Sequence, residues 1–179
     1  MLKLRIRILA PVVAALLILQ ACAGAINPRG KWQRQLVDGN IGASGVEVLE
    51  IKPDSTFHIL NSMIFEHNDS DFTCSYRFET TISGQWQLDG HNMLLLPDTT
   101  SYAFDDGDFK ANAVRNPSAA FDSISQTMHA DLAANIAAYY RAVYNNVASA
   151  GGIPMHCITI ANSQMAANIN ATTITWNKI

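Results

Sequence analysis

The sequence predicts a mainly β protein, a small antiparallel meander barrel with one long helical insertion before its last strands. Apolar and polar residues alternate with period two over residues 72–83, which is typical of a long, half-buried strand. Turn sequences at residues 53–55 and 89–90 connect strand-like segments closely, so neighbouring strands are expected to be antiparallel. From residue 121 to residue 147 apolar side chains recur every three or four positions, which predicts an amphipathic helix. An open antiparallel sheet with the helix packed across one face, an α+β arrangement, is the alternative.

The segments predicted as strands follow one another through short, turn-forming connections. They cover residues 30–37, 46–52, 56–60, 72–88, 93–96, 155–161 and 172–178. Gly84 marks a bend or a bulge within the longest of them, and residues 163–170 form a turn or a further short strand. A closed barrel of about six to eight strands would leave no exposed sheet edge.

The helical insertion has recognisable ends. An asparagine and a proline at residues 116–117 suit the cap and the first helical position, and a glycine pair at residues 151–152 ends the helix. A single rod over about residues 117–150 would be roughly 45 Å long, which is longer than a small domain needs. We therefore expect a break near residues 129–131.

The first residues have the pattern of an export signal. Residues 1–7 carry three cations and no acid, and residues 8–19 are all apolar, a run too short to span a bilayer. Residues 19–22 read Leu-Gln-Ala-Cys and resemble the lipobox of bacterial lipoproteins. The resemblance implies cleavage before Cys22 and acylation of its thiol. The two or three acyl chains of such a lipoprotein anchor it durably in a membrane. There are two alternatives. One is an ordinary signal peptide in which the cysteine is incidental, and the other is a transmembrane helix that is retained.

This interpretation divides the chain into three parts. They are a lipoprotein signal peptide over residues 1–21, a short tether over residues 22–29 and a single domain over residues 30–179. Removing the leader takes three of the twelve lysines and arginines and none of the fifteen acids, so the mature net charge becomes −6. Without a basic patch, we expect no nucleic-acid partner. The expected location is the bacterial cell envelope, on the periplasmic or the outer face of the outer membrane.

Two cysteines remain once Cys22 is acylated. Export would place Cys74 and Cys157 in an oxidising compartment, where a disulfide between them is a candidate. The alternative is a pair of buried thiols that act as small apolar side chains. The sequence does not decide between the two.

Several short motifs resemble one family. Residues 30–32 are similar to the glycine-x-tryptophan opening of lipocalins, and residues 48–57 resemble the second hairpin of lipocalin-like lipoproteins of Bacteroides-type bacteria. Residues 82–86 with 94–96, and the terminal residues 173–176, resemble further strands of such domains. The resemblance implies a calycin-type barrel and the binding of a small apolar molecule. The helical insertion departs from the family and leaves open whether the barrel mouth is covered.

Aromatic side chains gather on the apolar face of the predicted sheet. They either line a ligand cavity or fill a packed core, because large aromatic rings serve both purposes. The candidate lining residues are Trp32, Phe72, Tyr76, Phe78 and Trp86.

Motifs for catalysis or metal binding are missing from the sequence. The five histidines show no zinc-ligand spacing, and residues 66–71 and 105–108 are interpreted as solvated acidic loops. No nucleophile elbow or phosphate-binding loop is present. We therefore expect neither a cofactor nor an enzyme, although a hydrolase with an unrecognised pair of carboxylates stays open.

Two functions follow from these expectations. The first is a membrane-anchored lipocalin-like lipoprotein that binds a small hydrophobic ligand. The second is an accessory protein of the cell envelope that has no ligand and uses the helical insertion to dock a protein partner, which the sequence does not identify.

Overall fold

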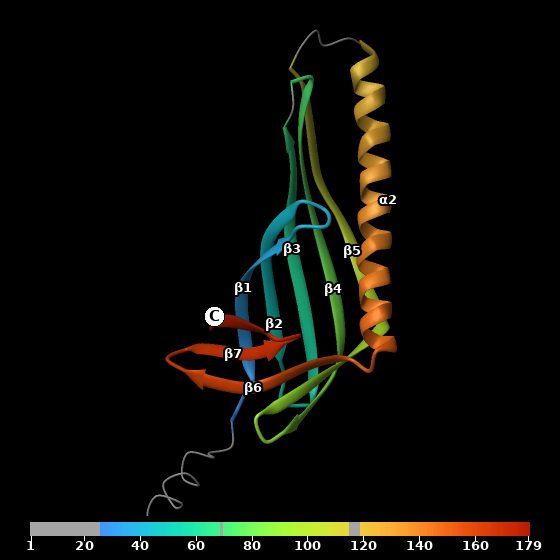
Figure 1. Ribbon diagram of the computed structural model, residues 1–179. Coiled ribbons are helices and arrows are strands. Elements are labelled where there is room, and N and C mark those ends of the chain that lie inside the picture. The colour runs from blue at the N-terminus through green and yellow to red at the C-terminus, as the bar shows by residue number, and fades with distance from the viewer. Residues whose placement is uncertain (1–25, 69, 115–118) are drawn as a thin grey trace, which may run out of the picture.

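The structure is a computed structural model that describes residues 26–68, 70–114 and 119–179. Within these residues, eight antiparallel strands form a meander in which each strand pairs with the next (Figure 1). The last strand pairs with the first through Trp32 opposite Lys178 and Gln33 opposite Asn177, which closes the barrel. The predicted meander barrel is thereby confirmed, and the alternative of an open sheet is not found.

The elements follow the predicted order, with the helix between the fifth and sixth strands. Their bounds are β1 Gly30–Asp38, β2 Ala43–Ile51, β3 Thr56–Asn68, β4 Phe72–Asp89, β5 Asn92–Ala113, α2 Ala119–Ser149, β6 Ile153–Ala161, β7 Gln164–Ile169 and β8 Thr172–Lys178. The segment expected to be a turn or a short strand is therefore the strand β7. Residues 1–25, with the predicted signal peptide and Cys22, lie outside the described residues.

Three strands, β3, β4 and β5, extend beyond the barrel. β4 has nearly its predicted length, whereas β3 and β5 are much longer than predicted. β3 and β5 run alongside β4 over most of its length, so β3, β4 and β5 project past the other strands (Figure 1). At 3.3 Å per residue, β4 alone spans roughly 60 Å. Residues 105–108, expected as a loop, lie within β5, because pairing with β4 holds this acidic, exposed segment in the sheet.

The helix α2 lies along this extension (Figure 1). It is a single element of 31 residues, so the break expected near residues 129–131 is wrong. The extended strands give the helix a partner of comparable length, which a compact barrel would not. The cap predicted at residues 116–117 lies outside the described residues, and no described helix is both long and apolar enough to cross a membrane.

The end of α2 is confirmed at the predicted glycine pair. The backbone N–H of Gly152 donates to the carbonyl of Val147, and that of Gly151 donates to Ala148. Both glycines have positive φ, at 90° and 108°, where other residues are strained. These two hydrogen bonds form a Schellman motif, which turns the chain from α2 into β6.

Candidate functional site

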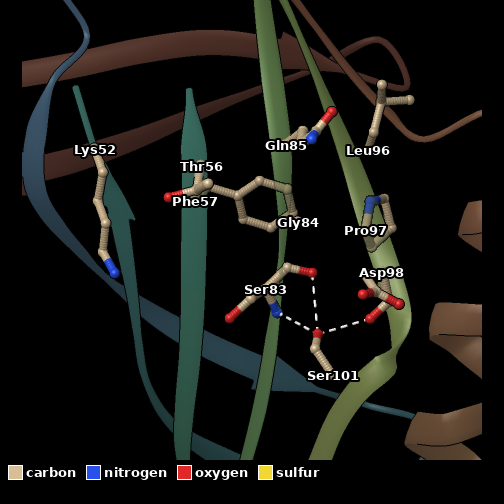
Figure 2. A pocket seen from close by; sticks show the side chains of 10 residues that line it. All are labelled: Lys52, Thr56, Phe57, Ser83, Gly84, Gln85, Leu96, Pro97, Asp98 and Ser101. Carbon is tan, nitrogen blue, oxygen red and sulfur yellow. Dashed lines mark hydrogen bonds between the residues drawn. The ribbon is translucent and has the colours of Figure 1, made fainter. Parts of the chain in front are cut away.

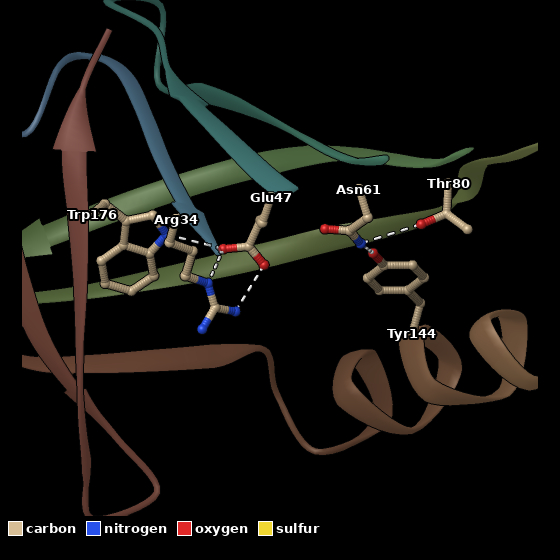
Figure 3. A network of polar contacts seen from close by, with 6 residues as sticks. All are labelled: Arg34, Glu47, Asn61, Thr80, Tyr144 and Trp176. Atoms are coloured by element: carbon tan, nitrogen blue, oxygen red, sulfur yellow. Dashed lines mark hydrogen bonds and ion pairs between the residues drawn. The ribbon is translucent and has the colours of Figure 1, made fainter. Parts of the chain in front are cut away.

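Four polar side chains form a row across the interior of the barrel. In the register of the sheet, Arg34 lies opposite Glu47, Glu47 opposite Asn61, and Asn61 opposite Thr80. They face inward, because each is two residues from a buried side chain on its own strand. The buried neighbours are Trp32, Leu49, Ile59 and Ile82. We call Arg34, Glu47, Asn61 and Thr80 the polar belt (Figure 3).

The charged half of the polar belt, Arg34 and Glu47, forms an ion pair. Arg34 donates to both carboxylate oxygens of Glu47, at 2.6 and 2.8 Å. The indole N–H of Trp176 donates to the same carboxylate at 2.9 Å, and the Arg34 guanidinium lies 5.2 Å from the Trp176 ring. A two-point contact between these groups is among the strongest ion pairs in proteins. The two charges therefore neutralise each other within the barrel.

The neutral half of the polar belt meets the helix. The Asn61 amide donates to the Tyr144 hydroxyl at 2.9 Å and to the Thr80 hydroxyl at 3.2 Å (Figure 3). Asn61 and Thr80 are fully buried, and burial raises the pKa of Tyr144 to about 12. The phenol of α2 is thus an uncharged hydroxyl that completes a hydrogen-bonded group on β3 and β4.

Two buried polar atoms beside this group lack a partner among the described residues. They are the side-chain carbonyl oxygen of Asn61 and the hydroxyl of Tyr140, one turn before Tyr144 on α2. Each such atom costs about 1–3 kcal/mol if it stays unbonded. Buried polar atoms without a hydrogen bond are rare in folded proteins, and an ordered water, an ion or a functional role accounts for such atoms.

The turn between β1 and β2 touches α2 beside Tyr140. The Asn40 amide donates to the Tyr139 hydroxyl at 3.0 Å, and that hydroxyl lies 3.4 Å from the Asp38 carboxylate. Burial and the nearby Asp38 carboxylate together raise the pKa of Tyr140. The hairpin and the helix therefore close one end of the barrel over the polar belt.

A second polar cluster attaches the first half of α2 to β5. The Tyr76 hydroxyl donates to Asp106 at 2.7 Å, and His129 contacts the same oxygen at 2.8 Å. The His129 ring stacks on Phe109, with 4.9 Å between centroids. Burial opposes ionisation of Asp106, but the hydrogen bonds from Tyr76 and His129 outweigh it and lower the pKa of Asp106.

The predicted lining residues are mostly packed rather than exposed to a cavity. Trp32, Tyr76 and Phe78 are at most 1 % exposed, and Trp86 is 8 % exposed. An enclosed, water-sized cavity would leave accessible surface on its lining, so these rings pack against other side chains. Tyr140 of α2 is one of them, 6.0 Å from Phe78 between centroids. Phe72 lies apart, half-buried at the start of β4 beside His67.

The candidate disulfide between Cys74 and Cys157 is not formed. Cys74 pairs with His67 near the β3–β4 turn, whereas the Cys157 N–H donates to Asn92 at the opposite end of β4. From residue 74 to residue 89, beside Asn92, β4 extends roughly 50 Å. A disulfide needs the two Cα atoms within about 7 Å. Cys74 is buried and Cys157 is exposed, so the alternative of two buried thiols applies only to Cys74.

A hollow of about 500 Å³ lies where β5 bulges away from β4 (Figure 2). The Ser83 N–H donates to the Ser101 hydroxyl at 2.8 Å, and that hydroxyl lies 2.7 Å from the Asp98 carbonyl oxygen. The Asp98 carboxylate accepts from Thr100. Because these groups already satisfy one another, we assign this hollow to the bulge rather than to a binding site.

Among residues 26–68, 70–114 and 119–179, no group of three or more His, Cys, Asp or Glu side chains is placed so that it could hold a metal ion. The polar belt itself was missed by sequence reasoning. Each of its four residues is a polar residue on the otherwise apolar face of one strand. Only the pairing of the strands shows that the four residues lie in a row.

Comparisons of the chain with protein-family models and with curated proteins find no match. The resemblance to lipocalins and the lipoprotein signal therefore stay predictions.

Proposed function

We propose that the protein is a lipid-anchored, lipocalin-like lipoprotein of the bacterial cell envelope that binds a small, largely apolar molecule. The molecule would lie between the polar belt and α2. The observation that carries the proposal is the neutral end of the polar belt, where the buried carbonyl oxygen of Asn61 has no hydrogen-bond partner among the described residues. An apolar barrel with a few placed polar groups is the usual composition of a small-molecule site.

Binding requires α2 to move, because the aromatic side chains beneath it are packed in this structure. Its attachments to the strands include the Tyr102 hydroxyl on the Ala137 carbonyl at 3.0 Å and the contact between His129 and Asp106. The glycine pair after the helix provides backbone freedom at its C-terminal end. We propose that α2 is a cover over the ligand site and that this structure is the closed form.

Anchoring at Cys22 is the other half of the proposal. Only seven residues separate Cys22 from Gly30, the first residue of β1, so an acylated protein would be held close to its membrane. Cys22→Ser is expected to abolish lipid labelling and to leave an unprocessed precursor. Normal maturation of this variant would disprove the lipoprotein assignment.

The ligand is tested by native mass spectrometry of the full-length protein purified from its own host. We expect a co-purifying small molecule that is lost from Asn61→Leu, which removes the amide at similar volume. Ser62→Ala is the matched control, because Ser62 is exposed on the same strand. If the unaltered protein carries no molecule, or if both variants retain it equally, the proposed site is wrong.

An accessory protein without a ligand is the second candidate. It is favoured by Ile124 on α2 and Val114 after β5, whose side chains are 56 % and 53 % exposed. A photocrosslinking residue beside Ile124 should then join one defined envelope protein, and Ile124→Ser should abolish the crosslink. Gln126→Ser, at an exposed position of the same helix, is the control. In either case we propose a role without catalysis.

A further inference from the structure

The chemical class of the ligand follows from the charges inside the barrel, and the inference rests on the function proposed above. Arg34 is the cation of the polar belt, and its two hydrogen bonds to Glu47 measure 2.6 and 2.8 Å. The Glu47 carboxylate also accepts from Trp176. A carboxylate ligand would have to displace Glu47 from Arg34 and leave that acid, whose side chain is only 12 % exposed, without its partner, which is costly.

The groups that remain for a ligand are uncharged. They are the Asn61 carbonyl oxygen and the Tyr140 hydroxyl, together with the Asn61 amide, which now donates to the hydroxyls of Tyr144 and Thr80. A hydroxyl on the ligand can donate to the Asn61 oxygen and accept from its amide or from Tyr140. The charges that act on this end of the belt are the carboxylates of Glu47 and Asp38, which oppose an anionic ligand group. An ammonium group would have to compete with Arg34 for Glu47.

The Tyr144 side chain occupies the place that such a ligand would take. It is an apolar ring with one hydroxyl, 7 % exposed, and the hydroxyl contacts the Asn61 amide. Burial raises the pKa of Tyr144 to about 12, so this environment disfavours a negative charge. Burial and the Asp38 carboxylate likewise raise the pKa of Tyr140. Both tyrosines are therefore uncharged at neutral pH.

We propose that the barrel selects an uncharged amphiphile, an apolar molecule with a single hydroxyl end, and that this hydroxyl replaces the Tyr144 phenol at Asn61 and Thr80. Fatty acids and long-chain amines of the same length are excluded by the closed pair of Arg34 and Glu47. The cover α2 then carries its own substitute for the ligand, which keeps the polar belt satisfied while the site is empty.

Photoaffinity labelling of the full-length protein in nanodiscs tests this selection. The probes are hexadecanol, hexadecanoic acid and hexadecylamine, each with a diazirine at the same carbon, with yields normalised to labelling of the nanodisc lipid. Adducts are located by mass spectrometry of peptides. We expect the alcohol to label the barrel interior and the covered face of α2 about ten-fold more than the acid or the amine. Unlabelled hexadecanol should compete, and unlabelled hexadecanoate should not.

Two variants sharpen the assignment. Glu47→Gln releases Arg34 from its partner and should raise labelling by the acid about ten-fold, whereas Glu79→Gln, at an exposed position of β4, should leave it unchanged. Asn61→Leu should lower labelling by the alcohol about five-fold, the equivalent of one hydrogen bond. Asn61→Leu keeps the test decisive if Glu47→Gln fails to fold.

The outcomes separate the two proposals. If none of the three probes labels the interior, the proposed binding function is wrong. If the acid or the amine labels the interior as strongly as the alcohol, binding stands and the selection of an uncharged ligand is wrong. Acid labelling that Glu47→Gln leaves unchanged would likewise overturn the role of the ion pair.

Discussion

The two ends of the barrel interior are built from different chemistry. Beyond the polar belt on the side of Trp32, Leu49 and Ile82, the core is apolar and is enclosed by paired strands. On the other side, three strands continue alone and α2 covers them, with Tyr76 and His129 hydrogen-bonded to Asp106. Hydrophobic packing does not depend on direction, whereas hydrogen bonds do. The first end therefore stabilises the fold without directional contacts, and the second is the part where we propose that α2 exchanges one set of hydrogen bonds for another.

The largest expected effect is in the strand-enclosed end. Trp32→Ala removes a side chain that is 1 % exposed and should lower the free energy of unfolding by about 3–5 kcal/mol, because it leaves a large cavity. Urea denaturation measures the change. Val37→Ala on the same strand, at a position 77 % exposed, should stay within about 0.5 kcal/mol. Equal losses in the two variants would contradict the comparison.

Breaking the ion pair between Arg34 and Glu47 should cause the second-largest loss of stability. Arg34→Met leaves the partly buried Glu47 without its cation and should destabilise the protein by roughly 3 kcal/mol. The double variant Arg34→Met, Glu47→Leu should recover most of that loss, because two apolar side chains then replace the pair. A thermodynamic cycle from denaturant unfolding measures the coupling. Additive losses would show that the pair is solvated rather than closed.

The hydrogen bond between α2 and the polar belt should contribute less to stability than the ion pair does. Tyr144→Phe removes the hydroxyl that accepts from Asn61 and should cost about 1 kcal/mol. Tyr139→Phe is the control from the same helix, since its hydroxyl contacts Asn40 at an exposed position. Hydrogen exchange should also show faster opening of α2 in Tyr144→Phe, while protection of β1 and β2 is unchanged. Uniformly faster exchange would argue against a separately moving cover.

The smallest effect should be the pH dependence at Asp106. Its folded pKa is lowered, so ionised Asp106 contributes stability above its unfolded pKa of about 3.9, and this is lost as the pH falls through the folded pKa. The contribution should stay below about 1 kcal/mol, because the Asp106 side chain is 49 % exposed and screened by solvent. Asp106→Asn should flatten the acid limb of a stability–pH curve, and an unchanged limb would remove Asp106 from this role.

The sequence alone determined the kinds of elements and their order. The alternation over residues 72–83 and the helical spacing over residues 121–147 are local patterns, and the structure has β4 and α2 at these places. The glycine pair after α2 was equally readable, because few other residues tolerate its positive φ. These features depend on backbone geometry and on neighbours close in sequence.

Only the tertiary structure decided the rest. The acidic segment of β5 is a strand because β4 supplies its hydrogen bonds, and the unbroken α2 has the extended strands beside it. Cys74 and Cys157 are far apart because Cys74 lies near the start of β4, whereas Cys157, on β6, lies beside the turn at the other end of β4. The polar belt exists because the register aligns one polar residue from each of four strands. Register is a property of pairs of strands, so no single segment of sequence contains it.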